Sequence, residues 1–309
     1  SVIVSDGDNI AYNEHAMRTG RLWGDRNRGQ VPITWTITPA LLDAAPQMLE
    51  YYYKTATPND NLVCGPSGIG YTRASNWWQP KSDVGDLGGL NNLLGSLSTH
   101  WPTEAFAKNY GALTNSYFER SNMNTLTIWR TITAQQANAF TSTFPALQGM
   151  TVMERNGSDF RTLSYTDSDA AIMYLGGGSG NKGMGLDTRY GNEANYMDSF
   201  KEDSSTYKSI ANSAKNFDPS KDDPRFIAMQ FSAWSGDISP TEFMNSMNKL
   251  QEEYPGKIEF VRLDHLNMLV NEFNGKPINA ALQADASASG SDDGYDAAKA
   301  VDGTFATAN

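Results

Sequence analysis

Two aspartates stand just after the first apolar run of the chain, where a buried strand would deliver them to a polar site. Residues 2–5 form that run, and Asp6, Asp8 and Asn9 follow it directly. Carboxylates in this position can transfer protons, attack a substrate as nucleophiles or bind a metal ion. The alternative is a turn that caps a helix, because Asp, Gly and Asn all favour turns. Other apolar runs of the chain are also followed by polar or aromatic residues, as in a barrel whose active site lies where its strands end. We therefore favour the functional interpretation of Asp6 and Asp8.

A third carboxylate, Glu154, follows the predicted strand at 150–153. Glycoside hydrolysis uses two carboxyl groups, one that protonates the leaving oxygen and one that attacks the sugar or activates water. If the predicted strands close into a barrel, Glu154 would lie across its open end from Asp6 and Asp8 and could form such a pair with either of them. It could equally be a solvated charge paired with Arg155 or Arg161, and both interpretations stay open.

Tryptophans on loops and strand ends could bind sugar rings, whose apolar C–H faces stack on indole. They are Trp77, Trp78, Trp129 and Trp234. The alternative is ordinary packing beneath a long loop. Because neighbouring residues of an extended segment point in opposite directions, we expect one of Trp77 and Trp78 to face a cleft.

Further polar and aromatic residues at strand ends are candidate substrate contacts. They are Asn9, Ser67, Tyr71 and Asp264. For Asp264 the alternative is the N-cap of the last predicted helix. With three separate histidines and one cysteine, Cys64, the chain carries no recognisable zinc motif, so we expect neither a metal nor a cofactor.

Alternation of strands and helices predicts the architecture that would position these side chains. We predict strands at 2–5, 31–38, 61–65, 125–129, 150–153, 170–175, 226–234 and 258–261, with helices at 40–55, 103–120, 204–214 and 241–253 and a last one that ends near residue 273. About eight parallel strands favour a (β/α) barrel of the TIM type over residues 1–276, with the active site where the strands end.

Composition limits the partners of the chain. Its 309 residues carry a net charge of −11, which argues against binding to nucleic acid or to anionic membranes. No apolar run reaches the length of a membrane span, so we expect no membrane insertion. A neutral polysaccharide or other glycan fits this balance. The chain lacks a start methionine, so we interpret it as a fragment or a processed product, and a missing signal peptide says nothing about export.

Two motifs together resemble the GxGYxYP family, whose members are bacterial proteins assigned to the glycoside hydrolases. The motifs are Ser5–Asn9 and Gly65–Tyr71, and the layout of later segments up to about residue 275 is similar too. The chain departs from the family motif at Arg73, where the family has a second tyrosine, and at Ala74, where it has proline. The resemblance implies sugar chemistry, with a specificity that differs if that tyrosine contacts the ligand.

The composition changes after Pro277, and residues 277–309 hold few large apolar side chains. We interpret them as a linker and the truncated start of a β-module. Ala286–Ser289 and Tyr295–Gly303 resemble the opening of a discoidin-like (coagulation factor type C) module, which implies a sugar-binding β-sandwich. Such an appendage would fit an extracellular or cell-surface bacterial enzyme.

The sequence therefore predicts a glycoside hydrolase with Asp6 or Asp8 and Glu154 as its carboxylate pair. One alternative is a barrel that binds glycans without cleaving them. Another is a metal-dependent polysaccharide deacetylase, which the missing histidine pair argues against.

Overall fold

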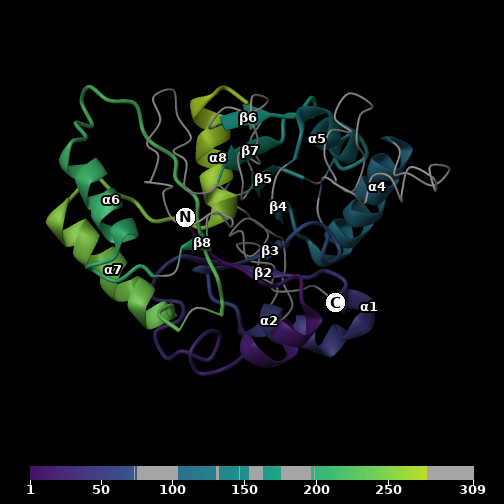
Figure 1. The fold of residues 1–309 in the computed structure, drawn as a ribbon, viewed down its shortest axis with the longest axis horizontal. Helices are drawn as coiled ribbons and strands as arrows, with labels where there is room; N and C mark the ends of the chain where they lie inside the picture. The colour runs from purple at the N-terminus through teal and green to yellow at the C-terminus, as the bar shows by residue number, and fades with distance from the viewer. Residues whose placement is uncertain are drawn as a thin grey trace, which may run out of the picture.

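A nine-stranded sheet lies at the centre of the computed structural model (Figure 1). The structure describes residues 1–72, 74, 104–129, 132–145, 147–152, 163–174, 196–197, 199–234 and 236–276. The strands are β1 (Val2–Val4), β2 (Ile33–Ile37), β3 (Asp60–Cys64), β4 (Thr125–Ile128), β5 (Gly149–Val152), β6 (Leu163–Tyr165), β7 (Ala171–Tyr174), β8 (Tyr196–Met197) and β9 (Met229–Phe231).

The sheet has the order β6-β7-β5-β4-β3-β2-β1-β9-β8, and every neighbouring pair is parallel except β6 with β7. Strands consecutive in the chain are therefore mostly neighbours in space, as in a TIM barrel. In the described residues the sheet forms a half-barrel, consistent with a TIM-like α/β fold.

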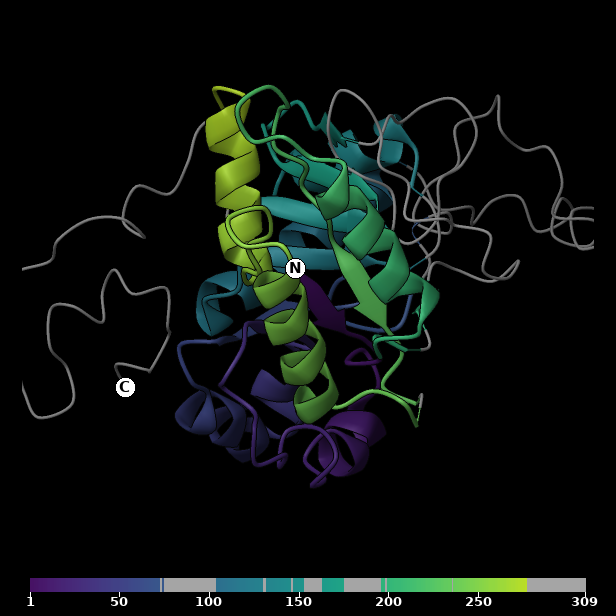
Figure 2. The same cartoon turned by 90° about the vertical axis from the view of Figure 1, so that its left-hand side faces the viewer.

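Most helices follow a strand and pack outside the sheet (Figures 1 and 2). They are the π-helix η1 (Tyr12–Ala16) and the α-helices α1 (Leu41–Ala44), α2 (Pro46–Thr55), α4 (Glu104–Ser121), α5 (Ala134–Thr141), α6 (Ser205–Lys215), α7 (Pro240–Glu253) and α8 (Leu263–Phe273). Ser204 and Ser239 cap α6 and α7 through their side chains. None of the helices in the described part of the chain has the length and apolar character needed to cross a bilayer.

Seven of the predicted strands overlap strands of the structure, but the eighth, at 258–261, is wrong. Residues 258–262 have no regular structure and lead directly into α8. They stay at the amino edge of the sheet, because Leu263 donates its backbone N–H to Thr34 Oγ1 (3.0 Å) near the start of β2. The strands β6 and β8 and the helix α5 were not predicted. The predicted helix 40–55 is two helices, because Pro46 keeps the preceding Ala45 out of the helical conformation.

The helix α8 crosses the amino ends of the strands. Asn267 donates its side-chain N–H to Thr125 Oγ1 (3.1 Å), at the start of β4. The same amide lies over Gly149, the first residue of β5, where a Cβ would approach it to 2.6 Å. This edge of the sheet is therefore covered by packed side chains, and the functional surface is expected at the other edge.

Candidate functional site

A cavity of about 670 Å³ opens at the carboxyl edge of the sheet. It is lined by Asp6, Asp8, Asn9, Ile10, Ala11, Thr38, Ala40, Ile69, Gly70, Tyr71 and Trp234. These residues follow β1, β2, β3 and β9, which are neighbours in the sheet. The cavity thus brings together five residues that the sequence singled out, namely Asp6, Asp8, Asn9, Tyr71 and Trp234.

A close approach of the chain to β2 places the two aspartates. Gly7 donates its N–H to Thr36 Oγ1 (2.9 Å), and a Cβ on Gly7 would overlap the backbone carbonyl of Thr36. Only glycine fits at this point. Asp6, with φ of 82°, adopts the left-handed conformation that aspartate tolerates better than most residues. The contact between Gly7 and Thr36 fixes the backbone between the two aspartates, so Asp6 and Asp8 lie in different surroundings.

Asp8 is buried, with 8% of its surface exposed, and its Oδ2 has no hydrogen-bond partner. Burial, reinforced by the nearby charge of Asp6, raises the pKa of Asp8 from 3.8 to about 7. A carboxyl group with this pKa holds its proton in a large fraction of molecules near neutral pH. It can therefore act as a proton donor.

Asp6 lies in a different environment. Its Oδ2 accepts hydrogen bonds from the N–H of Ala233 (3.0 Å) and from the hydroxyl of Ser232 (3.2 Å). Burial raises the pKa of Asp6, whereas these two hydrogen bonds favour its charged form and oppose that rise.

Two exposed aromatic side chains border the cavity. Tyr71 is 60% exposed and Trp234 is 61% exposed, and each ring rests on a second aromatic ring. Tyr71 packs on Trp129 with 4.5 Å between ring centroids, and Trp234 meets the edge of Tyr12 at 5.9 Å. Tyr71 follows β3 and Trp234 follows β9, so the strand order places the β1 carboxylates between them. Exposed aromatic rings beside carboxylates suit the stacking of sugar rings.

Ser67 and Trp129 support this site from behind. Ser67 is fully buried, and its Oγ accepts the N–H of Trp129 (2.7 Å). The carbonyl of Ser67 accepts the hydroxyl of Tyr110 (3.0 Å), which also approaches Gly68 so closely that a Cβ there would lie 2.7 Å away. Ser67 is not among the residues that line the cavity, so the structure gives it a scaffolding role.

Asp264 lies at the opposite edge of the sheet. Its carboxylate pairs with the guanidinium of Arg262 through two hydrogen bonds of 3.1 and 2.8 Å. Arg262 is the N-cap of α8, so the interpretation of Asp264 as the N-cap of this helix is wrong. The structure does not bring Asp264 to the cavity. The remaining predicted residues, Glu154, Trp77 and Trp78, lie outside the described residues.

Several residues near the carboxylates were not predicted as functional. Ile10 and Thr38 line the cavity, while Tyr12, Ser232 and Arg21 support its side chains. Ser232 directly follows β9, so the rule that polar residues end strands could have found it. In the described residues, no group of three or more His, Cys, Asp or Glu side chains is arranged to hold a metal ion.

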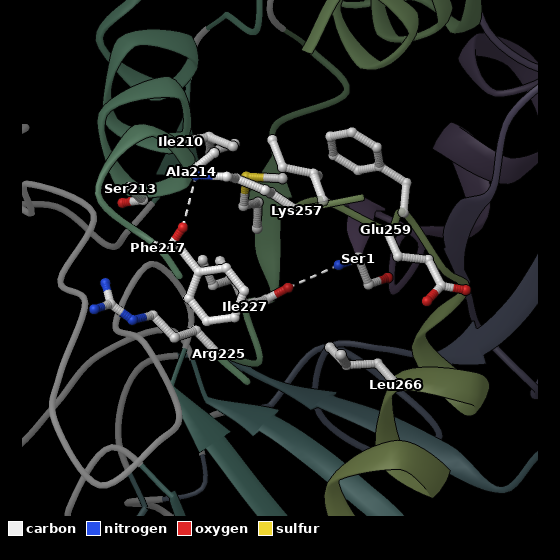
Figure 3. Close-up of a pocket in the computed structure, with 13 residues that line it drawn as sticks. Ser1, Ile210, Ser213, Ala214, Phe217, Arg225, Ile227, Lys257, Glu259 and Leu266 are labelled. Atoms are coloured by element: carbon white, nitrogen blue, oxygen red, sulfur yellow. Dashed lines mark hydrogen bonds between the residues drawn. The ribbon is translucent and has the colours of Figure 1, made fainter. Parts of the chain in front are cut away.

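A second cavity, of about 130 Å³, lies at the amino edge beside the first residue of the chain (Figure 3). Most of its lining residues are apolar, and they come from Ser1, α6, residues 217–229, residues 257–260 and α8. Lys257 donates to the carbonyl of Phe217 (2.7 Å), and Glu259 supplies the one carboxylate among its described lining residues. Of these two cavities, the one at the carboxyl edge is lined by two carboxylates, Asp6 and Asp8.

Comparisons with known proteins agree with the fold. A crystal structure described as a putative hydrolase from Bacteroides thetaiotaomicron VPI-5482 is similar to this chain, with a TM-score of 0.58 and 18% identity. The similarity covers 88% of this chain and 44% of that chain, so this chain spans less than half of its length. No curated protein matches the sequence.

The sequence itself carries the family assignment. The match to a family model ends at residue 271, so the discoidin-like resemblance of the tail gains no support from it and stays a prediction. Because the GxGYxYP putative glycoside hydrolase C-terminal domain matches residues 1–271, this chain belongs to the GxGYxYP putative glycoside hydrolase family.

Proposed function

We propose that the chain hydrolyses a glycan and that Asp8 donates a proton to the leaving oxygen. The observation that carries this proposal is the buried Asp8 carboxyl, which lacks a partner on Oδ2, lines the cavity at the carboxyl edge and has a pKa of about 7. When the glycosidic bond breaks, the proton of Asp8 passes to the leaving oxygen, and a second carboxylate either attacks the anomeric carbon or takes a proton from the attacking water.

Glu154 is the proposed second carboxylate. It comes soon after β5, which lies on the same parallel sheet as β1. Residues that follow parallel strands gather at one edge of the sheet, and this supports the pairing with Asp8. Asp6 is the reserve candidate, because its carboxylate lines the same cavity as Asp8.

Tyr71 and Trp234 are the proposed sugar platforms. Their exposed rings border the cavity after β3 and β9, with the β1 carboxylates between them in strand order. A glycan bound across the cavity would stack one sugar ring on each platform and place the bond between them near Asp8. This arrangement favours a substrate of at least two sugar units.

Hydrolysis of a panel of polysaccharides, followed by release of reducing ends, tests the proposal. We expect the chain to cleave at least one of them, and Asp8→Asn and Glu154→Gln each to abolish cleavage while circular dichroism shows an intact fold. Asp223→Asn is the matched control, since Asp223 is an exposed aspartate between α6 and β9. Near-normal rates in both site variants would refute the catalytic assignment. Glycan binding without cleavage by the unmodified chain would support a binding barrel instead.

A further inference from the structure

The turn that carries Trp234 is attached to Asp6. It comprises residues 232–234, directly after β9. Ala233 N–H and the Ser232 hydroxyl both donate to Asp6 Oδ2, at 3.0 and 3.2 Å. The same Ser232 oxygen accepts the backbone N–H of Trp234 at 3.3 Å. One hydroxyl therefore connects the Asp6 carboxylate to the residue that bears the exposed indole.

Arg21 holds the same turn from its other side. Its guanidinium donates to the carbonyl of Ala233 (2.5 Å) and to the carbonyl of Ile238 (3.1 Å). Ala233 thus donates its N–H to the Asp6 carboxylate, and its carbonyl accepts a hydrogen bond from the Arg21 guanidinium. Hydrogen bonds to charged groups are stronger than neutral ones, so this clamp of Asp6, Ser232 and Arg21 fixes the backbone at Trp234.

The indole depends on that backbone for its position. Trp234 is 61% exposed, and one side of its indole makes an edge-type contact with the buried ring of Tyr12. An exposed ring supported on one side can rotate away when its backbone is released. Asp8 differs from Asp6 in this respect, because its Oδ2 is buried and has no hydrogen bond to the turn that carries Trp234.

We propose that Asp6 is a positioning residue, which holds Trp234 in place for sugar stacking through Ser232 and Ala233 and leaves the proton transfer to Asp8. The kinetic part of this inference rests on the proposed function, whereas the structural part does not. The two aspartates then have separate tasks, and replacement of Asp6 is expected to weaken substrate binding more than the chemical step.

Fluorine NMR of the full chain labelled with 5-fluorotryptophan tests the structural part without a substrate. The chain has seven tryptophans, and Trp234→Phe identifies the resonance of Trp234. We expect Asp6→Ala and Ser232→Ala each to shift and narrow that resonance, because each removes a hydrogen-bonding group of the clamp, while the other resonances report an intact fold. Asp8→Asn and the control Asp223→Asn should leave it in place. An unmoved Trp234 resonance in both clamp variants, or an equal shift in Asp8→Asn, would overturn the proposal.

Kinetics on a polysaccharide that the unmodified chain cleaves test the second part. At a pH about two units below the pKa of Asp8, we expect Asp6→Ala and Ser232→Ala to raise KM roughly two- to tenfold, as for loss of one aromatic contact, with a much smaller change in kcat. A large fall in kcat for Asp6→Ala with an unmoved Trp234 resonance would instead make Asp6 a catalytic residue. If no polysaccharide is cleaved, the proposed function fails, but the NMR result still decides whether the clamp exists.

Discussion

Replacement of Asp8 by asparagine is expected to stabilise the protein at alkaline pH while it removes the proposed activity. In the folded chain the pKa of Asp8 is raised from 3.8 to about 7 by burial and by the charge of Asp6. Ionised Asp8 therefore destabilises the folded state relative to the unfolded chain, in which water solvates the carboxylate. Asparagine has nearly the same shape as the neutral carboxylic acid and never ionises.

The magnitude follows from the two pKa values. A rise from 3.8 to about 7 corresponds to a cost of up to roughly 4 kcal/mol, at about 1.4 kcal/mol for each pH unit. Between these two values the folded state holds a proton that the unfolded state has lost, so the free energy of unfolding falls as pH rises through this window. The advantage of Asp8→Asn is thus near zero below about pH 4 and complete above about pH 7.

Urea unfolding of the unmodified chain and of Asp8→Asn, at about pH 4 and about pH 8, measures this advantage directly. We expect Asp8→Asn to be more stable than the unmodified chain only at the higher pH. In a thermal unfolding experiment at that pH, each kcal/mol of this gain would raise the Tm by roughly 2–4 °C. Asp223→Asn, at an exposed aspartate outside the residues that line the cavity, is the matched control. Equal effects of Asp8→Asn at both pH values would refute the claim that Asp8 is buried as a costly carboxylate, and with it the argument for its role as a proton donor.

Three other changes test the fold. Gly7→Ala is expected to lower the free energy of unfolding by about 1–3 kcal/mol or more, because the added methyl overlaps the carbonyl of Thr36; an unchanged urea midpoint would contradict the close approach. Asp60→Asn is expected to cost about 3–5 kcal/mol in the same assay, since it leaves the guanidinium of Arg28, only 13% exposed, without its anion; a cost below 1 kcal/mol would count against this pairing. Truncation after Pro277 should leave the Tm nearly unchanged, because the tail lacks the apolar area to offset the ordering entropy of about 1–2 kcal/mol per residue; a fall of many degrees would show that the tail packs on the barrel.

Apolar runs predicted the parallel strands well because such strands are buried on both faces. β1 is apolar throughout, whereas β2 and β4 alternate threonine with apolar residues, yet every residue of these three strands is buried. An apolar run gave a wrong strand prediction at residues 258–261. There, Ile258, Phe260 and Val261 pack at the amino edge of the sheet without forming a strand. Local sequence cannot distinguish these cases, since the difference lies in the path of α8 across the sheet.

The site was predicted in part for a similar reason. Asp6, Asp8 and Trp234 follow strands, so the rule for strand ends placed them at one edge. Ser67 obeys the same rule but points into the protein, because the turn at Gly65–Gly68 folds back against Tyr110 and Trp129. Arg21 gave no signal, because it reaches Ala233 from a part of the chain far away in sequence.

The surroundings of the buried carboxylates differ at the two edges of the sheet, and this contrast bears on function. At the amino edge, Asp60 accepts hydrogen bonds from Arg28, from the Trp35 indole and from both donors of Thr57. A buried carboxylate so fully paired is accounted for by structure alone. Asp8 at the carboxyl edge has an oxygen without a partner and an elevated pKa, which makes its burial costly. Any hydrophobic or amide side chain of similar size would remove that cost, so stability does not explain the presence of an aspartate there. The proposed role of Asp8 as a proton donor to a bound glycan would explain it.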